Sequence, residues 1–162
     1  MIRLLAGLAA SLLALSGSAA RTTSAAAANG SSAGYGWPLR PGPDRIIRDF
    51  DPPLHPWLAG NRGLDLAGTA GQEVRAANSG IVSFAGQVGG VGAVSVTFGA
   101  LRTTYEPVTP AVRQGDRVEV GDVIGRLQGN DLHWGLLRGT DYLDPLALLG
   151  LEQVRLLPSA PA

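Results

Sequence analysis

The sequence contains no cysteine and no lysine, and its only two histidines are His55 and His133. Without cysteine the fold can use neither a disulfide bond nor a thiolate metal ligand, so packing alone must hold it together. Without lysine, the G-D-x-V-x-x-G-x-x-I pattern at 115–124 cannot belong to a carrier domain that bears biotin or lipoate on a lysine. Net charge is zero, with the signs interspersed, so no positive patch favours a nucleic acid or an anionic membrane.

The N-terminal residues predict export. A single basic residue, Arg3, precedes an apolar run from Leu4 to Leu15, which small residues follow up to residue 20. The run is shorter than the roughly 20 residues that span a bilayer, so we expect a cleaved signal peptide at 1–20 rather than a membrane anchor. The predicted organisation continues with a flexible linker at 21–34, one folded domain at 35–151 and a C-terminal tail at 152–162.

The predicted domain is all-β, because short segments rich in β-branched and apolar residues alternate with glycines. Val94, Val96 and Phe98 alternate with polar or small residues and are expected to share one strand face. Only 144–151 predicts a helix, with Asp144 as its N-cap and a proline at its first position. The predicted strand segments are 73–77, 80–85, 92–98, 101–108, 116–120, 122–127 and 132–138.

The segments 71–76 and 115–120 share the pattern G-x-x-V-x-(small or Val), and a glycine and two β-branched residues follow each of them. A glycine-rich β protein can produce such a match by chance. A duplicated strand–turn–strand unit explains it more economically, and we expect that duplication.

The polar residues that could form a site lie within apolar strands. In D-L-H-W-G, strand alternation directs Asp131 and His133 to one face, while Leu132 and Trp134 anchor the strand in the core. Asp65 lies between two leucines, and a strand carboxylate in that setting needs an ion pair or a metal. From spacing alone, an ion pair of Asp65 with His133 or with Arg62 competes with a metal site.

Several segments resemble one family, the LytM/lysostaphin-type peptidoglycan zinc metallopeptidases. The run 61–86 resembles the opening of that domain, and 115–125, 132–135 and 142–146 resemble its closing segments. The stretch R-T-T-Y-E-P-V at 102–108 resembles the form found in small exported actinobacterial members. The resemblance implies an antiparallel β-sheet core with a duplicated hybrid motif, similar to a barrel-sandwich, and one short C-terminal helix.

The resemblance also assigns roles to residues. The family binds zinc through H-x-x-x-D and the last histidine of H-x-H, and the first histidine of H-x-H acts as general base. Asp65 and His133 occupy the positions of the aspartate and the last histidine, whereas Asn61 replaces the first ligand. Asp131 occupies the general-base position, and Tyr105-Glu106-Pro107 replaces a further Y-x-H segment. An amide oxygen is a poor zinc ligand, so zinc is expected to bind weakly or not at all, unless Asp131 or His55 supplies a replacement ligand.

These replacements lead to the functional prediction. The chain is expected to be a secreted, extracytoplasmic, cell-wall-associated domain that acts on or binds peptidoglycan and is catalytically impaired by Asn61 and Asp131. An active zinc endopeptidase that cleaves peptide cross-links with a non-standard ligand set is the alternative. The expected partners are a peptidoglycan peptide or a cell-wall hydrolase. No nucleic acid and no stable membrane insertion are expected, and the domain is expected to be a monomer.

Overall fold

The computed structural model describes residues 34–53, 55 and 57–151. The predicted signal peptide, the predicted tail and all but the last residue of the predicted linker lie outside these described residues. Within these ranges, no helix is long and apolar enough to cross a membrane. The strands are β1 (Ile46–Arg48), β2 (Gly63–Ala67), β3 (Glu73–Arg75), β4 (Gly80–Val88), β5 (Val91–Phe98), β6 (Leu101–Glu106), β7 (Val108–Pro110), β8 (Arg117–Val118), β9 (Val123–Leu127), β10 (Asp131–Arg138) and β11 (Asp141–Leu143).

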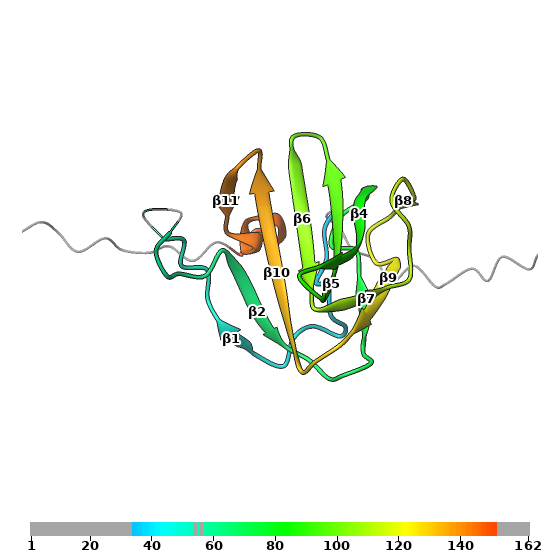
Figure 1. The fold of residues 1–162 in the computed structure, drawn as a ribbon, viewed down its shortest axis with the longest axis horizontal. Helices are drawn as coiled ribbons and strands as arrows, with labels where there is room; N and C mark the ends of the chain where they lie inside the picture. The colour runs from blue at the N-terminus through cyan, green and yellow to red at the C-terminus, as the bar shows by residue number, and fades with distance from the viewer. Residues whose placement is uncertain (1–33, 54, 56, 152–162) are drawn as a thin grey trace, which may run out of the picture. The chain divides into compact units, whose positions relative to one another are not determined.

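The strands form two antiparallel sheets (Figure 1). The larger sheet has the order β1-β2-β10-β6-β5-β4-β8, with β11 paired to β10, and the smaller sheet has the order β3-β9-β7. This arrangement confirms the predicted all-β, antiparallel core. It also brings β2 and β10, which are distant in sequence, side by side next to the edge strand β1 of the larger sheet.

The predicted C-terminal helix is present but shorter than expected. It is a 3-10 helix, η1, at Pro145–Leu149. The Asp144 side chain caps it by accepting a hydrogen bond of 2.9 Å from the backbone N–H of Leu146. Gly150 ends it in the left-handed conformation, with φ of 67°, which a glycine adopts without steric cost. The sequence pattern missed β1 and β11, which are each only three residues long.

The two copies of the predicted repeat exchange strands. The first copy supplies β3 and β4 and the second supplies β8 and β9, yet β3 pairs with β9 and β4 pairs with β8. The backbone N–H of Gly71 donates to Leu127 O at 2.8 Å, and that of Gly115 donates to Val82 O at 2.8 Å. Both glycines have positive φ, 82° and 94°, at equivalent positions before their strands. The matching turns and hydrogen bonds support the duplication that the sequence pattern predicted.

The core lies behind the central strands. Trp134 of β10 is fully buried and faces Tyr105 of β6, which is also fully buried. Trp37 packs against Trp134 with ring centroids 5.9 Å apart. Trp134 is therefore the core anchor that strand alternation predicted, and Trp37 covers it from a preceding segment.

A buried hydrogen-bond network surrounds the Tyr105 hydroxyl. This hydroxyl donates to Thr103 Oγ1 at 3.0 Å and accepts from the Ala77 backbone N–H at 3.0 Å. Thr103 Oγ1 in turn donates to Asn78 Oδ1 at 2.8 Å. Burial, partly offset by these hydrogen bonds, raises the pKa of Tyr105 to about 12. The phenol therefore stays neutral and links β6 to the segment that follows β3.

Replacing Tyr105 with phenylalanine is expected to lower the free energy of unfolding by about 1–2 kcal/mol, because the buried Ala77 N–H and Thr103 hydroxyl each lose a partner. A second effect depends on pH. The neutral phenol contributes stability below its unfolded pKa near 10, and that stability is lost as pH rises through about 12. Denaturant titrations between pH 8 and 12 should show a smaller alkaline loss for Y105F than for wild type. Tyr142→Phe, at a ring that is 41% exposed, is the control, and equal alkaline losses in Y105F and wild type would contradict this role.

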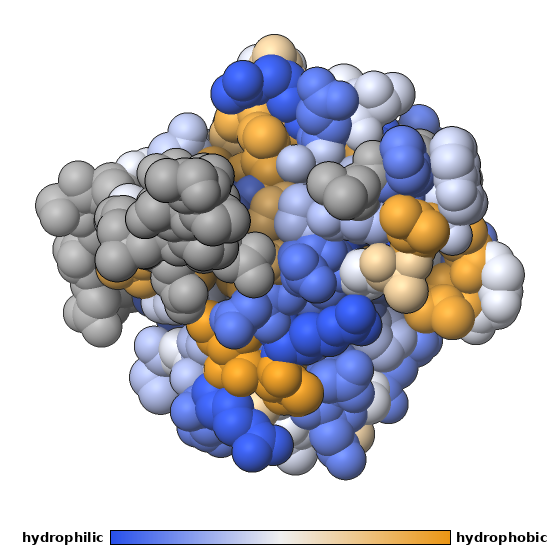
Figure 2. All heavy atoms as spheres, turned by 90° about the vertical axis from the view of Figure 1, so that its left-hand side faces the viewer, coloured by the Kyte–Doolittle hydropathy of each residue, from blue (hydrophilic) through white to orange (hydrophobic). Residues whose placement is uncertain are grey.

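The side of the molecule that carries β1 shows mainly hydrophilic surface, with small and separate hydrophobic areas (Figure 2). Ile47 of β1 is 46% exposed there. Such scattered apolar residues are normal on a protein surface.

Candidate functional site

Asp65 and His133 form the centre of the candidate site. They are direct register partners on β2 and β10, and Asp65 Oδ1 lies 2.7 Å from His133 Nδ1. Both side chains are partly buried, with 23% and 28% of their surface exposed. Because a carboxylate only accepts hydrogen bonds, Nδ1 carries the proton in this contact and Nε2 is left as the second functional atom of the ring. The predicted convergence of the two residues is thus present in the structure, as is the ion-pair geometry that the sequence left open.

Asn61 lines the same cleft as His133, and its amide nitrogen is already engaged. The side chain is only 4% exposed, and its Nδ2 donates to Asp49 O at 3.0 Å and to Arg48 O at 3.4 Å. Its backbone also forms two hydrogen bonds with Asp51, of 2.7 and 2.9 Å. The residue at the first-ligand position therefore ties the start of β2 to the segment that follows β1.

Asp131 does not complete the site. It is exposed at the start of β10, opposite Ala67, and it is not among the residues that line the cleft described below. Across 34–53, 55 and 57–151, no group of three His, Cys, Asp or Glu residues is placed to hold a metal ion. A catalytic zinc needs three protein ligands, so the residues described here do not fit such a centre.

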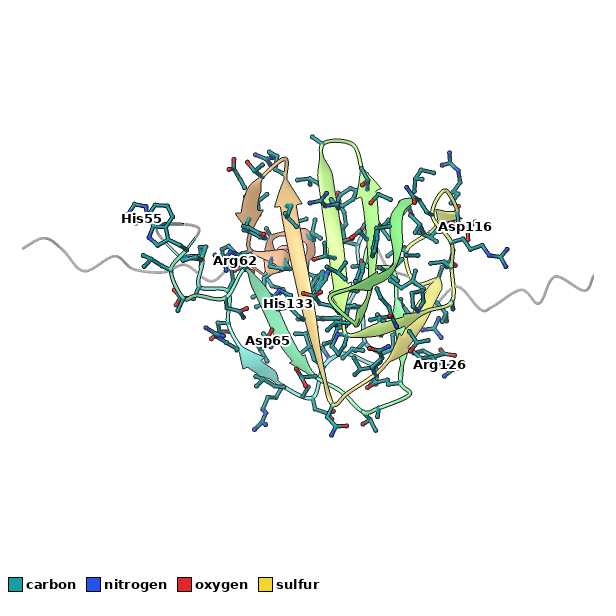
Figure 3. All side chains as sticks on the ribbon, in the orientation of Figure 1. His55, Arg62, Asp65, Asp116, Arg126 and His133 are labelled. Carbon is teal, nitrogen blue, oxygen red and sulfur yellow. The ribbon has the colours of Figure 1, made fainter. Side chains whose placement is uncertain are left out.

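His55 does not approach the pair either. Its ring stacks on Trp57, with centroids 4.9 Å apart and an interplanar angle of 4°. Figure 3 shows His55 at the end of a loop, well away from Asp65 and His133. In this structure His55 is a surface aromatic partner and not a replacement ligand.

A cleft of about 600 Å³ opens beside His133. A cross-strand pair of glycines, Gly63 and Gly135, lies beside two of its lining residues, His133 and Thr104. A methyl group on Gly63 would lie 2.4 Å from Trp134 O and 2.9 Å from His133 Nε2, and one on Gly135 would lie 2.5 Å from Thr104 Oγ1. The lining residues are Gly60, Asn61, Arg62, Phe84, Val88, Ala93, Ser95, Arg102, Thr104, Glu106, His133, Leu137 and Tyr142.

Strand β6 contributes a polar row to the cleft that the sequence analysis did not single out. Arg102, Thr104 and Glu106 alternate with Thr103 and Tyr105, which are buried, and the first three line the cleft. Glu106 is the register partner of His133 on the side of β10 opposite Asp65. Alternation along the predicted strand 101–108, applied as for Val94 and Val96, places these three side chains on one face, whereas the family resemblance gave Glu106 only as part of a replaced Y-x-H segment.

An antiparallel sheet that carries an aspartate and a histidine on adjacent strands, with the histidine lining an open cleft, fits a domain of the LytM/lysostaphin type. The family model described as Peptidase family M23 matches residues 59–145, which include β2 to β11. The chain belongs to this family.

The match to curated relatives covers more of the chain than the match to the family model. The chain is 44% identical over 147 residues to "Uncharacterized protein Rv2891" of Mycobacterium tuberculosis, in an alignment that covers 83% of this chain and 59% of that protein. The chain thus spans less than two thirds of the curated relatives it matches.

Solved structures share the fold. The structure of Helicobacter pylori Csd3 is similar with a TM-score of 0.61 and 27% identity, over 69% of this chain and 33% of that one. The catalytic domain of lysostaphin from Staphylococcus simulans is similar with a TM-score of 0.58 and 22% identity, over 65% of this chain and 92% of that one. At 22% identity, the likeness to the lysostaphin domain shows a shared fold only.

Proposed function

We propose that this chain is an exported M23-family domain that binds peptidoglycan peptides in its cleft without hydrolysing them. The observation that carries the proposal is the pair of hydrogen bonds that the Asn61 side chain donates. Its amide nitrogen is committed to two backbone carbonyls, so at most an amide oxygen stands where the family places a ligand histidine. Amide oxygen is a weak partner for zinc, and two strong ligands are too few for a catalytic centre.

The acid–base chemistry of the cleft is also limited. Hydrolysis of a peptide bond needs an activated water and a group that takes its proton within hydrogen-bond reach. Asp131, at the position of the family general base, is exposed and does not line the cleft. His133 Nδ1 is engaged with Asp65, which leaves only Nε2 to meet a ligand. A polar cleft with an engaged histidine can bind a peptide through hydrogen bonds without cleaving it.

The proposal predicts binding without turnover. The full chain, incubated with purified peptidoglycan sacculi and added zinc, should sediment with the sacculi and release no muropeptides above a blank. Elemental analysis of the dialysed protein should give far less than one zinc per chain, because the ligand set is incomplete. The catalytic domain of lysostaphin serves as the positive control for the release assay.

Two results would decide against this proposal. Zinc at one equivalent, together with release of muropeptides that a chelator abolishes, would establish the alternative, an active endopeptidase with a non-standard ligand set. A chain that neither sediments with sacculi nor releases muropeptides would instead favour a protein partner such as a cell-wall hydrolase. In that case the cleft would serve a contact between proteins.

A further inference from the structure

We propose that Arg102 and Arg62 form a carboxylate-binding subsite at the end of the cleft away from Asp65 and His133. The cleft would take a short extended peptide whose carboxylate lies at this end. The inference rests on the proposed function, because it names the chemistry of the peptide that the cleft binds. It assigns this recognition to residues that are not part of the replaced metal site.

The strand register places the two arginines at the same end of the cleft. Arg102 of β6 is the register partner of Leu137 of β10, and Leu137 is also the partner of Tyr142 of β11. The Arg62 guanidinium lies over the Tyr142 ring, 5.7 Å from its centroid. All four residues line the cleft. Two guanidinium-bearing side chains thus approach one region from opposite sides of β10.

The opposite end of the cleft is acidic. Glu106 lies four residues from Arg102 on the same face of β6, a separation of about 13 Å on an extended strand. Neither of these two side chains has a hydrogen bond or an ion pair with any residue in the described part of the chain. They are too far apart to neutralise each other. The cleft therefore presents a cation at one end and a carboxylate at the other, each open to a ligand.

This charge distribution favours a ligand that has a carboxylate at one end and an amine at the other. Guanidinium groups bind carboxylates through two parallel hydrogen bonds, and the half-exposed Tyr142 ring beneath Arg62 helps to hold that side chain in place. Thr104 and Ser95 line the space between the ends and can exchange hydrogen bonds with a peptide backbone. An amine and a carboxylate about 13 Å apart correspond to an extended peptide of about four residues.

The test uses two synthetic peptides, acetyl-Lys-Ala-Ala-Ala with a free carboxylate and the same peptide ending in a carboxamide. NMR titration of the full chain should give a dissociation constant about fivefold lower for the carboxylate form, since a partly exposed charge-assisted hydrogen bond contributes roughly 1 kcal/mol. Arg102→Gln should abolish this preference. Arg117→Gln, an exposed arginine on β8 at the other edge of the sheet, should preserve it.

Equal affinity of the wild-type chain for the two peptides, or a preference that survives in R102Q, would overturn the subsite. A lack of measurable binding to either peptide would overturn it as well. The sacculus assay keeps this result separate from the proposed function. If the chain binds sacculi but has equal affinity for the two peptides, only the subsite is refuted. If it prefers the carboxylate peptide but does not sediment with sacculi, only the peptidoglycan assignment is refuted.

Discussion

Gly63→Ala is expected to lower the free energy of unfolding by about 3 kcal/mol, at the upper end of the usual cost of overpacking. The added methyl group would lie 2.4 Å from the carbonyl oxygen of Trp134. This obstacle is main chain in the adjacent strand, so β2 and β10 must separate to relieve it. For a domain of this size, thermal denaturation should show a melting temperature lower by about 10 °C. The His133 ring, 2.9 Å from the same methyl position, must also move.

Two variants test the steric explanation. Gly34→Ala is the matched control, because a methyl group there has no neighbour within 4 Å, and its melting temperature should equal that of wild type. Gly135→Ala meets a side chain instead, Thr104 Oγ1 at 2.5 Å. The added substitution Thr104→Ala should therefore restore most of the stability that Gly135→Ala removes. An unchanged melting temperature in Gly63→Ala would show that β2 and β10 tolerate separation beside the cleft.

Asn61→His is expected to tighten zinc binding by about 10- to 100-fold, because imidazole replaces an amide oxygen beside Asp65 and His133. The expected stability cost is about 1–2 kcal/mol, since the hydrogen bonds from Asn61 Nδ2 to the Arg48 and Asp49 carbonyls are lost. Isothermal titration with zinc and competition with a chromophoric chelator would give the change in affinity.

Asn61→Ala provides the matched control for the metal titration. It loses the same two hydrogen bonds but gains no imidazole, so its zinc affinity should not exceed that of wild type. If Asn61→His and Asn61→Ala bind zinc equally, the side chain at 61 does not face Asp65 and His133, and the chain is not one substitution away from a His-Asp-His site. A gain in zinc affinity without muropeptide release would in turn assign the missing chemistry to the replaced histidine positions, Asp131 and the segment Tyr105-Glu106-Pro107.

The fold could be predicted from the sequence because its signals are local. Alternation such as Val94-Ser95-Val96 determines which face is buried, and glycines mark the turns. The short strands β1 and β11 lie outside the segments that showed such a signal. Their positions depend on pairing with β2 and β10, which is a tertiary effect.

The candidate site was predicted only in part. The residues themselves predicted an ion pair of Asp65 with His133, and the family resemblance predicted that the two side chains converge. In the structure the two side chains are adjacent and within hydrogen-bond distance. Nothing in the sequence indicated that the Asn61 amide would donate to the Arg48 and Asp49 carbonyls, because β1 itself was not predicted. The basic end of the cleft was missed for a related reason. It forms only when β2, β6 and β11 are all placed around β10.

Because the two repeats exchange strands, each strand of one copy pairs with a strand of the other copy. A protein made of one copy would have to lend its first strand to a second molecule and receive the equivalent strand in return. In topology, this part of the chain is therefore a symmetric homodimer whose two subunits have been fused by a peptide link. The segment between the two copies, which contains β5 and β6, occurs only once and carries cleft residues that a symmetric dimer would present twice.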